Sequence, residues 1–114
     1  MQSLISNMKK FFIITNEHKD MNLAMTNAIS DYIIAKGGTC MHYVSTKSGW
    51  RERNLRRFQP SDIDAECIIV LGGDGTLVRA ARDMASIGIP LIGVNLGTLG
   101  YLCELERSTV YDAI

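Results

Sequence analysis

A run of apolar residues that ends in a cluster of glycines constrains this chain more than any other feature. Residues 68–71 read Ile-Ile-Val-Leu, and Gly72-Gly73-Asp74-Gly75-Thr76-Leu77 follows directly. Four aliphatic residues in a row are typical of a strand that is buried on both faces of a parallel sheet. Because Gly72, Gly73 and Gly75 allow backbone angles that residues with a Cβ resist, we expect the strand to stop at Gly72 and to turn tightly.

The residues after this turn predict a helix. Apolar residues recur there at spacings of three and four, at Leu77, Ala80, Ala81, Met84 and Ala85. We expect Thr76 to cap the amino end of the helix, with the N–H groups of the turn pointing toward its mouth. The amino end of a helix attracts phosphate, so the turn is a candidate anion site that also contains a carboxylate, Asp74.

The other apolar patterns alternate between strands and helices. We expect strands at residues 11–15, 39–45 and 91–94, and a helix that runs from Met21 until Gly37-Gly38 terminates it. A further helix is expected from Ser108 to Ile114. With the strand and helix of the glycine turn included, the strands are residues 11–15, 39–45, 68–71 and 91–94, and the helices are residues 21–36, 77–85 and 108–114. Residues 47–57 form a polar connection.

A second glycine turn, residues 96–102, follows the strand predicted at 91–94. Both glycine turns would then lie at the carboxyl ends of strands, the edge at which open α/β sheets bind ligands. We therefore expect a three-layer α/β domain with a mostly parallel sheet and one crevice lined by two loops. In this reading residues 1–7 are an N-terminal lead and residues 8–114 form the domain.

The composition excludes several classes of function. The 114 residues are 46% hydrophobic and 21% charged, which suits a single soluble domain with a modest core. Twelve basic and twelve acidic residues balance, so no overall charge attracts nucleic acid or a membrane surface. We expect neither as a partner. The cations at residues 47–57 are a local exception, and we place this connection on the rim of the crevice as a hypothesis.

The cysteines and the amino-terminal residues bear on location. Cys40, Cys67 and Cys103 are odd in number and widely spaced, which argues against a zinc site or a disulfide framework. Lys9-Lys10 precedes an apolar run, but that run ends at Asn16 and is too short for a signal sequence or a membrane span. We expect a reduced, cytoplasmic protein.

The glycines at residues 72–75 can be compared with two known phosphate-binding patterns, the P-loop and the dinucleotide fingerprint. No lysine follows a suitable glycine pair, which excludes the P-loop pattern. The dinucleotide fingerprint matches weakly, because Val78 occupies its last position and the glycines follow the third expected strand. A carboxylate in a phosphate-facing turn repels its ligand unless it holds a divalent cation or accepts a proton. Asp74 therefore favours phosphoryl transfer over simple anion binding.

Three segments together resemble bacterial NAD kinases. They are Gly72-Gly73-Asp74-Gly75-Thr76-Leu77, Arg79-Ala80-Ala81-Arg82, and Gly93-Val94-Asn95-Leu96-Gly97-Thr98-Leu99-Gly100-Tyr101-Leu102. Diacylglycerol and sphingosine kinases and, more distantly, phosphofructokinases carry turns like the first segment, and the last segment separates them. The resemblance covers nearly the whole chain as that family's N-terminal α/β domain.

This resemblance implies an activity and a set of site residues. It implies phosphorylation of the adenosine ribose 2′-hydroxyl of NAD, with ATP or polyphosphate as donor and a divalent metal, expected to be magnesium. Asp74 would be the catalytic carboxylate, Gly75 and Arg79 would contact nucleotide, and Tyr101 would lie beside adenine where the family often has phenylalanine. The supporting glycine turns would comprise Gly72, Gly73, Gly97 and Gly100. No residue is assigned as a metal ligand.

One departure concerns the family's second signature, an Asn followed by Glu or Asp, which lies downstream in the hinge to a β-rich domain. Asn16-Glu17 has these letters but precedes the glycine turn, so the role is not transferred to it. We expect the C-terminal β-rich domain, absent from this chain, to supply much of the NAD pocket. The chain would be half of an enzyme that is homo-oligomeric at full length, and inactive alone.

Plainer interpretations stay open at this point. Asp74 could only cap a turn, Arg79 and Arg82 could be a solvated helix face, and Tyr101 could be core. A lipid kinase of the diacylglycerol type is the second enzyme hypothesis. A non-catalytic nucleotide-binding or oligomerisation module is the third reading of the chain.

Overall fold

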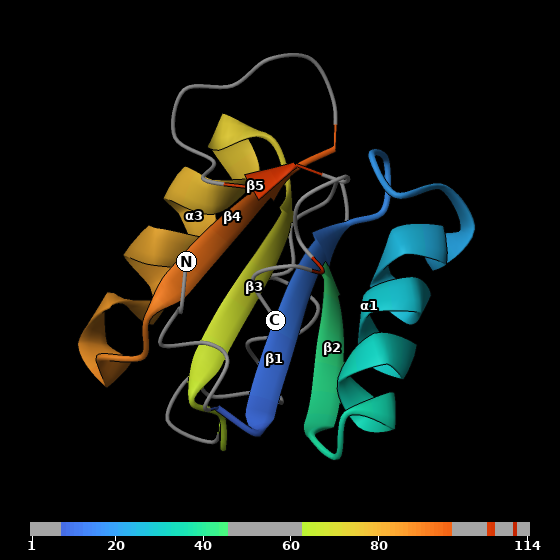
Figure 1. The fold of residues 1–114 in the computed structure, drawn as a ribbon. Coiled ribbons are helices and arrows are strands. Elements are labelled where there is room, and N and C mark those ends of the chain that lie inside the picture. The colour runs from blue at the N-terminus through green and yellow to red at the C-terminus, as the bar shows by residue number, and fades with distance from the viewer. Residues whose placement is uncertain (1–7, 46–62, 97–104, 107–110, 112–114) are drawn as a thin grey trace.

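The computed structural model describes residues 8–45, 63–96, 105–106 and 111. Strands and helices alternate along them, as the sequence predicts (Figure 1). In chain order the elements are β1 (Lys10–Asn16), η2 (Met21–Leu23), α1 (Ala24–Ala35), β2 (Thr39–Ser45), β3 (Cys67–Gly72), α3 (Asp74–Met84), η4 (Ala85–Ile87), β4 (Leu91–Asn95) and β5 (Leu105–Glu106).

The five strands form one sheet in the order β2-β1-β3-β4-β5. Every neighbouring pair is parallel, which confirms the expectation of a mostly parallel sheet. The central strand β3 is buried along its whole length, from Cys67 to Gly72. A strand in this position has no face toward water, and this explains why its sequence is an unbroken apolar run.

Helices cover the two faces of the sheet, so the domain has three layers as expected (Figure 1). Side chains alternate between the faces along each strand. On β1, Phe11 and Ile13 belong to the cluster that includes Ile29 and Ile33 of α1. Phe12 belongs to the other cluster, which contains Ala80 and Met84 of α3. Burial of each large aliphatic side chain stabilises the fold by about 1.5–3 kcal/mol.

The first helical segment begins differently from the prediction. A helix from Met21 was expected, but residues Met21–Leu23 form a 3-10 turn and α1 starts at Ala24. Asn22 and Leu23 both have positive φ, which interrupts the helix, and the side chain of Met21 is 70% exposed. Asp20 supplies the reason. Its buried carboxylate accepts hydrogen bonds from the N–H groups of Met25 and Thr26, so the N–H groups of α1 are capped from five residues upstream.

The strand predictions at residues 11–15, 39–45 and 91–94 are confirmed within one residue at each end. The short edge strand β5 was not predicted, because two residues carry no periodic signal. The connection at residues 47–57 lies outside the described residues. The helix expected at 108–114 does too, except for Tyr111, whose ring packs edge-on against Tyr32 of α1 at 5.0 Å. Within the part of the chain that the structure describes, no helix could span a membrane.

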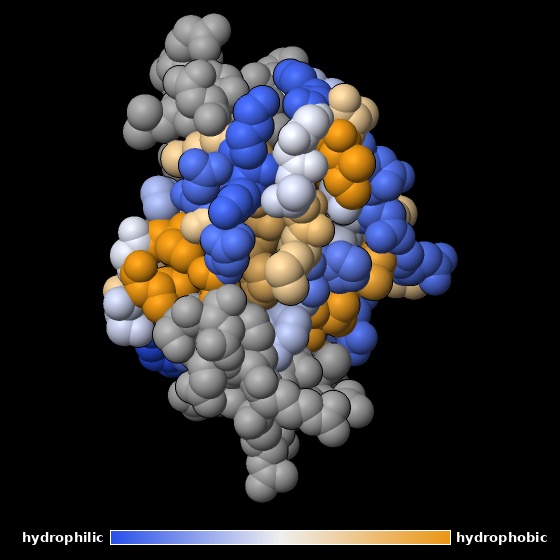
Figure 2. Space-filling view, turned by 90° about the horizontal axis from the view of Figure 1, so that it is seen from below, coloured by the Kyte–Doolittle hydropathy of each residue, from blue (hydrophilic) through white to orange (hydrophobic). Residues whose placement is uncertain are grey.

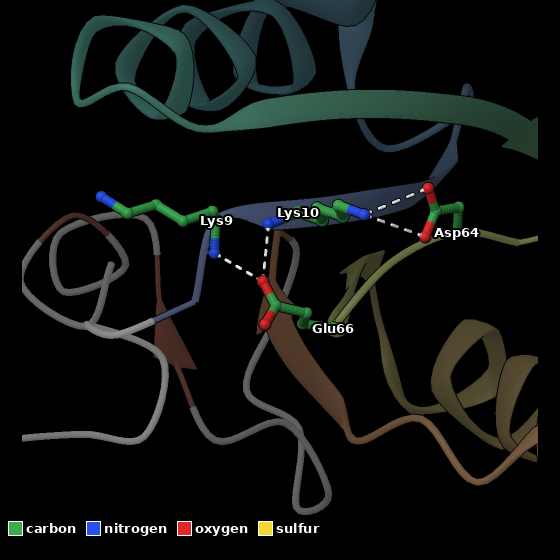
Figure 3. A network of polar contacts seen from close by, with 4 residues as sticks. All are labelled: Lys9, Lys10, Asp64 and Glu66. Atoms are coloured by element: carbon green, nitrogen blue, oxygen red, sulfur yellow. Dashed lines mark hydrogen bonds and ion pairs between the residues drawn. The ribbon is translucent and has the colours of Figure 1, made fainter.

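A polar network joins the starts of β1 and β3 at the amino edge of the sheet (Figure 3). Glu66 Oε1 accepts hydrogen bonds from the backbone N–H groups of Lys9 and Lys10, at 2.7 and 3.1 Å. Lys10 Nζ lies 3.3 Å from Asp64 Oδ2 in an exposed ion pair. The network therefore aligns two central strands far from their carboxyl ends.

Seen from this edge, hydrophobic residues form separate patches between hydrophilic ones, as on ordinary solvated surfaces (Figure 2).

Glu66 makes the stability of the domain depend on pH. The two backbone hydrogen bonds, from Lys9 and then Lys10, hold the pKa of Glu66 below its ordinary value of 4.5. A lowered carboxyl pKa stabilises the folded state above the unfolded pKa, and this contribution is lost as pH falls through the folded pKa. We predict that Glu66→Gln lowers the melting temperature at neutral pH, and that the difference from wild type disappears in acid.

Thermal melts of both proteins from pH 7 down to about pH 3, below the ordinary range of carboxyl pKa values, would measure this. Asp64→Asn is the matched control, because Asp64 belongs to the same network through an exposed ion pair that contributes little. A Glu66→Gln deficit that stays constant across the range would contradict the prediction.

Candidate functional site

The strand order creates a switch point between β1 and β3. The chain leaves β1 for β2 on one side and leaves β3 for β4 on the other, although β1 and β3 are themselves paired. At the carboxyl edge, which lies at the top of Figure 1, the two connections therefore diverge. Open α/β sheets bind ligands in the crevice that forms at such a point. Asn16 ends β1 here, and Gly72 ends β3.

The turn after β3 is shorter than the sequence predicted. Thr76 was expected to cap the helix, but α3 begins at Asp74 and its N-cap is Gly73. Gly73 is extended, with φ −121° and ψ −167°, and the helix closes at once through a 3.1 Å bond from Leu77 N–H to the carbonyl of Gly73. Strand and helix are thus joined by a single residue. Asp74 and Gly75 become the first two residues of α3, at the end of a helix that favours anions.

Gly72 is required by a close approach. A Cβ built on it would lie 2.6 Å from Thr76 Oγ1 and 2.8 Å from Thr76 Cβ. The first turn of α3 therefore folds back directly over the end of β3. Glycine suits this position in the turn because the side chain of Thr76 occupies the space that a Cβ would need.

Gly73 and Gly75 differ from Gly72. A Cβ added to either would meet nothing within 4 Å among the described residues, and neither has a positive φ. The expectation that these two glycines serve unusual backbone angles is therefore wrong. Their lack of a side chain instead leaves space on both sides of Asp74 that no described residue fills, and a ligand could approach the backbone closely there.

A surface cavity of about 470 Å³ opens beside the first turns of α3. Its lining residues recur at helical spacing and so share one face of the helix: Asp74, Gly75, Val78, Arg79 and Arg82. Three of the predicted site residues, Asp74, Gly75 and Arg79, are therefore brought together. Val78 is 51% exposed and gives the cavity an apolar wall.

The second glycine segment begins beside the first. Asn95, the last residue of β4, pairs with Gly72, and Leu96 N–H donates to the carbonyl of Gly72 at 2.9 Å. The two segments therefore start at the same edge of the sheet, as the sequence predicted. Gly97, Gly100 and Tyr101 follow directly but lie outside the described residues.

The charges on this face of α3 favour an anionic ligand that meets one carboxylate. The positive end of the helix dipole lies at Asp74, and two guanidinium groups follow along the same face. Arg82 is the more distant of them, and its Nε lies 3.9 Å from Asp83 Oδ1. The Arg82 side chain is 64% exposed, whereas the Asp83 side chain is only 7% exposed, so the contact joins an exposed guanidinium to a buried carboxylate at the far end of the cavity.

Asn16 received no role from the sequence, but the structure brings it to the turn. Its Nδ2 donates a hydrogen bond to Thr76 Oγ1 at 3.2 Å, across 60 residues of sequence. Its Oδ1 accepts from the N–H of His18 at 2.9 Å. One signal could have identified it, because a polar residue directly after a buried strand lies at the ligand-binding edge of a parallel sheet.

A divalent metal fits this site only together with a phosphorylated ligand. Among the described residues no group of three His, Cys, Asp or Glu side chains could hold a metal ion. The cavity lining contains one carboxylate, Asp74. Magnesium is commonly held by one or two carboxylates together with substrate phosphates rather than by a cage of protein ligands. The donor set present here is of that kind.

Fold and site together describe a parallel α/β domain with a glycine-aspartate turn at its switch point. Residues 11–114 match the family model of the ATP-NAD kinase N-terminal domain. The chain is 51% identical over 109 residues to an NAD kinase of Agathobacter rectalis and 45% identical over 106 residues to one of Lachnoclostridium phytofermentans. A third relative, an NAD kinase of Lachnospira eligens, is 37% identical over 110 residues. The chain belongs to the NAD kinase family.

These alignments cover 94%, 93% and 94% of the chain, but only 38%, 36% and 37% of the respective relatives. The chain thus spans a little over a third of the length of the curated relatives it matches.

The glycines of the turn should respond to alanine in opposite ways. Gly72→Ala forces a Cβ against Thr76 and should destabilise the domain by about 1–3 kcal/mol, the usual cost of overpacking. Gly75→Ala meets open space inside the first turn of a helix, so it should leave stability unchanged or raise it by up to about 1 kcal/mol. Denaturant unfolding of the two variants would measure this. Equal losses of stability would contradict the assignment of different roles.

Proposed function

We propose that this chain is the catalytic-motif domain of an NAD kinase, which transfers a phosphoryl group to the adenosine ribose 2′-hydroxyl of NAD. Family membership supports the reaction, and the placement of Asp74 at the first position of α3 on the switch-point edge supports the mechanism. Membership also favours this reading over a lipid kinase or a non-catalytic module. ATP or polyphosphate would be the donor.

Asp74 is proposed as the general base. A ribose hydroxyl is a weak nucleophile at neutral pH, and a positioned carboxylate that accepts its proton assists attack on phosphorus. The 2′-oxygen then forms a bond to the terminal phosphorus of the donor as the bond to the leaving phosphate oxygen breaks, and Asp74 keeps the proton. Open space at Gly73 and Gly75 would let the ribose reach the carboxylate.

The neighbouring residues are proposed to bind nucleotide. Gly75 offers a backbone N–H in the first turn of α3, and Arg79 adds a cation one turn further along the cavity. Tyr101 keeps its proposed place beside adenine, and Gly97 and Gly100 their place in the second turn. All three lie outside the described residues, so this part of the proposal rests on the resemblance alone.

Asp74 could serve either as base or as metal partner, and since we propose it as the base, a divalent cation, proposed to be magnesium, would be held mainly by the substrate phosphates. When bound it would neutralise phosphate charge that otherwise repels the carboxylate. Residues of the chain itself carry out the proton transfer and the binding of the anionic groups. Asp74 must take the proton, and the helix dipole of α3 with Arg79 must hold the anionic groups in place.

We propose that the full-length protein works in the cytoplasm on NAD and ATP. Among the described cysteines, Cys67 is buried and burial raises the pKa of the Cys40 thiol, so both thiols are poorly reactive. That the full-length protein is a homo-oligomer, and binds neither nucleic acid nor membrane, stays a prediction.

Replacement of Asp74 by Asn tests the mechanism. In the complete kinase Asp74→Asn keeps nearly the same volume but cannot accept the proton, so turnover should fall by roughly 10²–10⁴, or about 3–5 kcal/mol of barrier. Its melting temperature should fall only slightly, because Asp74 loses a favourable interaction with the helix dipole. Steady-state rates and melting curves would be compared with those of Asp64→Asn, an exposed carboxylate at the opposite edge. A folded Asp74→Asn variant that keeps more than about a tenth of wild-type turnover would remove Asp74 from the chemistry.

The 114-residue chain alone should fold without turning over. The described residues already form two hydrophobic core clusters and one five-stranded sheet, which can hold a domain together. A carboxylate gains no rate from proximity unless a substrate is positioned against it, and we propose that further residues of the kinase complete the NAD pocket. A cooperative melt without NADP formation is the expected result. Sustained NADP formation by the isolated chain would contradict the proposal.

A further inference from the structure

Asn16 connects the loop after β1 to the first turn of α3 at the switch point. It is the last residue of β1, and both ends of its carboxamide are used. Oδ1 accepts from the N–H of His18 in the loop that leaves β1, while Nδ2 donates to Thr76 Oγ1 in the first turn of α3. The backbone carbonyl of Asn16 also accepts from Lys19 and Asp20, at 3.0 Å each, which fixes the residue in its own loop.

Thr76 carries this connection to the turn that holds Asp74. It is the third residue of α3, two positions beyond Asp74, and its side chain lies over Gly72 at the end of β3. One side chain is thus in contact with the ends of both strands that flank the switch point. A hydrogen bond to Thr76 Oγ1 therefore holds the first turn of α3 relative to β1 as well as β3.

The residues around Asp74 supply little restraint of their own. Gly73 and Gly75 flank it, and glycine leaves the backbone more freedom than any other residue. Gly73 is also the N-cap of α3, and it offers no side-chain cap hydrogen bond among the described residues. A catalytic group in so permissive a segment must be fixed from outside, by side chains on rigid elements. The bond from Asn16 is of this kind, because β1 is paired with β2 on one side and β3 on the other.

We propose that Asn16 is a positioning residue for phosphoryl transfer, and that it acts through the hydroxyl of Thr76 on the placement of Asp74. This inference rests on the proposed function. General-base catalysis requires the carboxylate within hydrogen-bonding reach of the reacting hydroxyl, and a displacement of about 1 Å can cost about 100-fold in rate. Asn16 therefore affects the rate of the chemical step more than the binding of NAD.

Three variants of the complete kinase test the proposal: Asn16→Ala, Thr76→Val and the two combined. Thr76→Val removes the hydroxyl with little change of shape and leaves the bond from His18 to Asn16 in place, so it remains informative if Asn16→Ala folds poorly. Each single variant should lower kcat by about 10-fold to 100-fold. KM for NAD should change much less. The double variant should lose no more than the larger single loss, because both changes remove the same bond.

Two further variants separate positioning from general stability. Thr76→Ser keeps the acceptor oxygen and should retain kcat close to wild type. Glu66→Gln weakens the network at the opposite edge, so it should lower the melting temperature at neutral pH without lowering kcat. A purely structural role for Asn16 would instead produce the same pattern as Glu66→Gln.

The outcomes distinguish this inference from the proposed function. A wild-type complete enzyme that forms no NADP overturns the proposed function and the positioning role with it. If the wild type is active, a folded Thr76→Val variant with unchanged kcat overturns the positioning role alone. Losses that multiply in the double variant would show that the two residues act independently, which also overturns it. A shared loss of kcat with rescue by Thr76→Ser supports the inference.

Discussion

The burial of β3 determines where this domain can do chemistry. All six residues of the strand are shielded from water between α1 and α3, so its first exposed position comes only where the strand ends. The close approach of Thr76 to Gly72 then starts the next helix with a single intervening residue. Asp74 is placed at the positive end of a helix dipole, beside the carboxyl edge of the sheet. The position of the proposed base follows from the packing of the core.

Strand pairing brings a residue from another part of the chain to the glycine turn. The order β2-β1-β3 brings the end of β1 beside the end of β3. Asn16 at the end of β1 therefore contacts α3, a helix that begins far later in the chain, at Asp74. Among the described residues, the lining of the cavity beside α3 has one carboxylate, two arginines and Gly75, at which an added Cβ would meet nothing within 4 Å. Such a site suits a phosphorylated ligand that brings its own cation, and this agrees with membership of the NAD kinase family.

Much of this arrangement could be predicted from the sequence, because buried parallel strands and amphipathic helices have strong periodic patterns. The strands at residues 11–15 and 68–71 and the placement of Asp74 at a sheet edge are examples. Predictions from local sequence patterns failed where contacts between residues distant in sequence determine the structure. Thr76 has the residue type of a helix cap, but its side chain packs over Gly72 and binds Asn16 instead. Asp20 caps α1 from beyond a 3-10 turn, which no spacing rule indicates.

Asp74 is proposed to meet the 2′-hydroxyl of NAD at the switch point. A crystal structure of the complete kinase with NAD bound would show whether it does. A carboxylate oxygen of Asp74 should lie within about 2.6–3.2 Å of the ribose 2′-oxygen, the range required of a general base. NAD bound with its 2′-oxygen against another element, and with Asp74 turned away from it, would exclude Asp74 as the base.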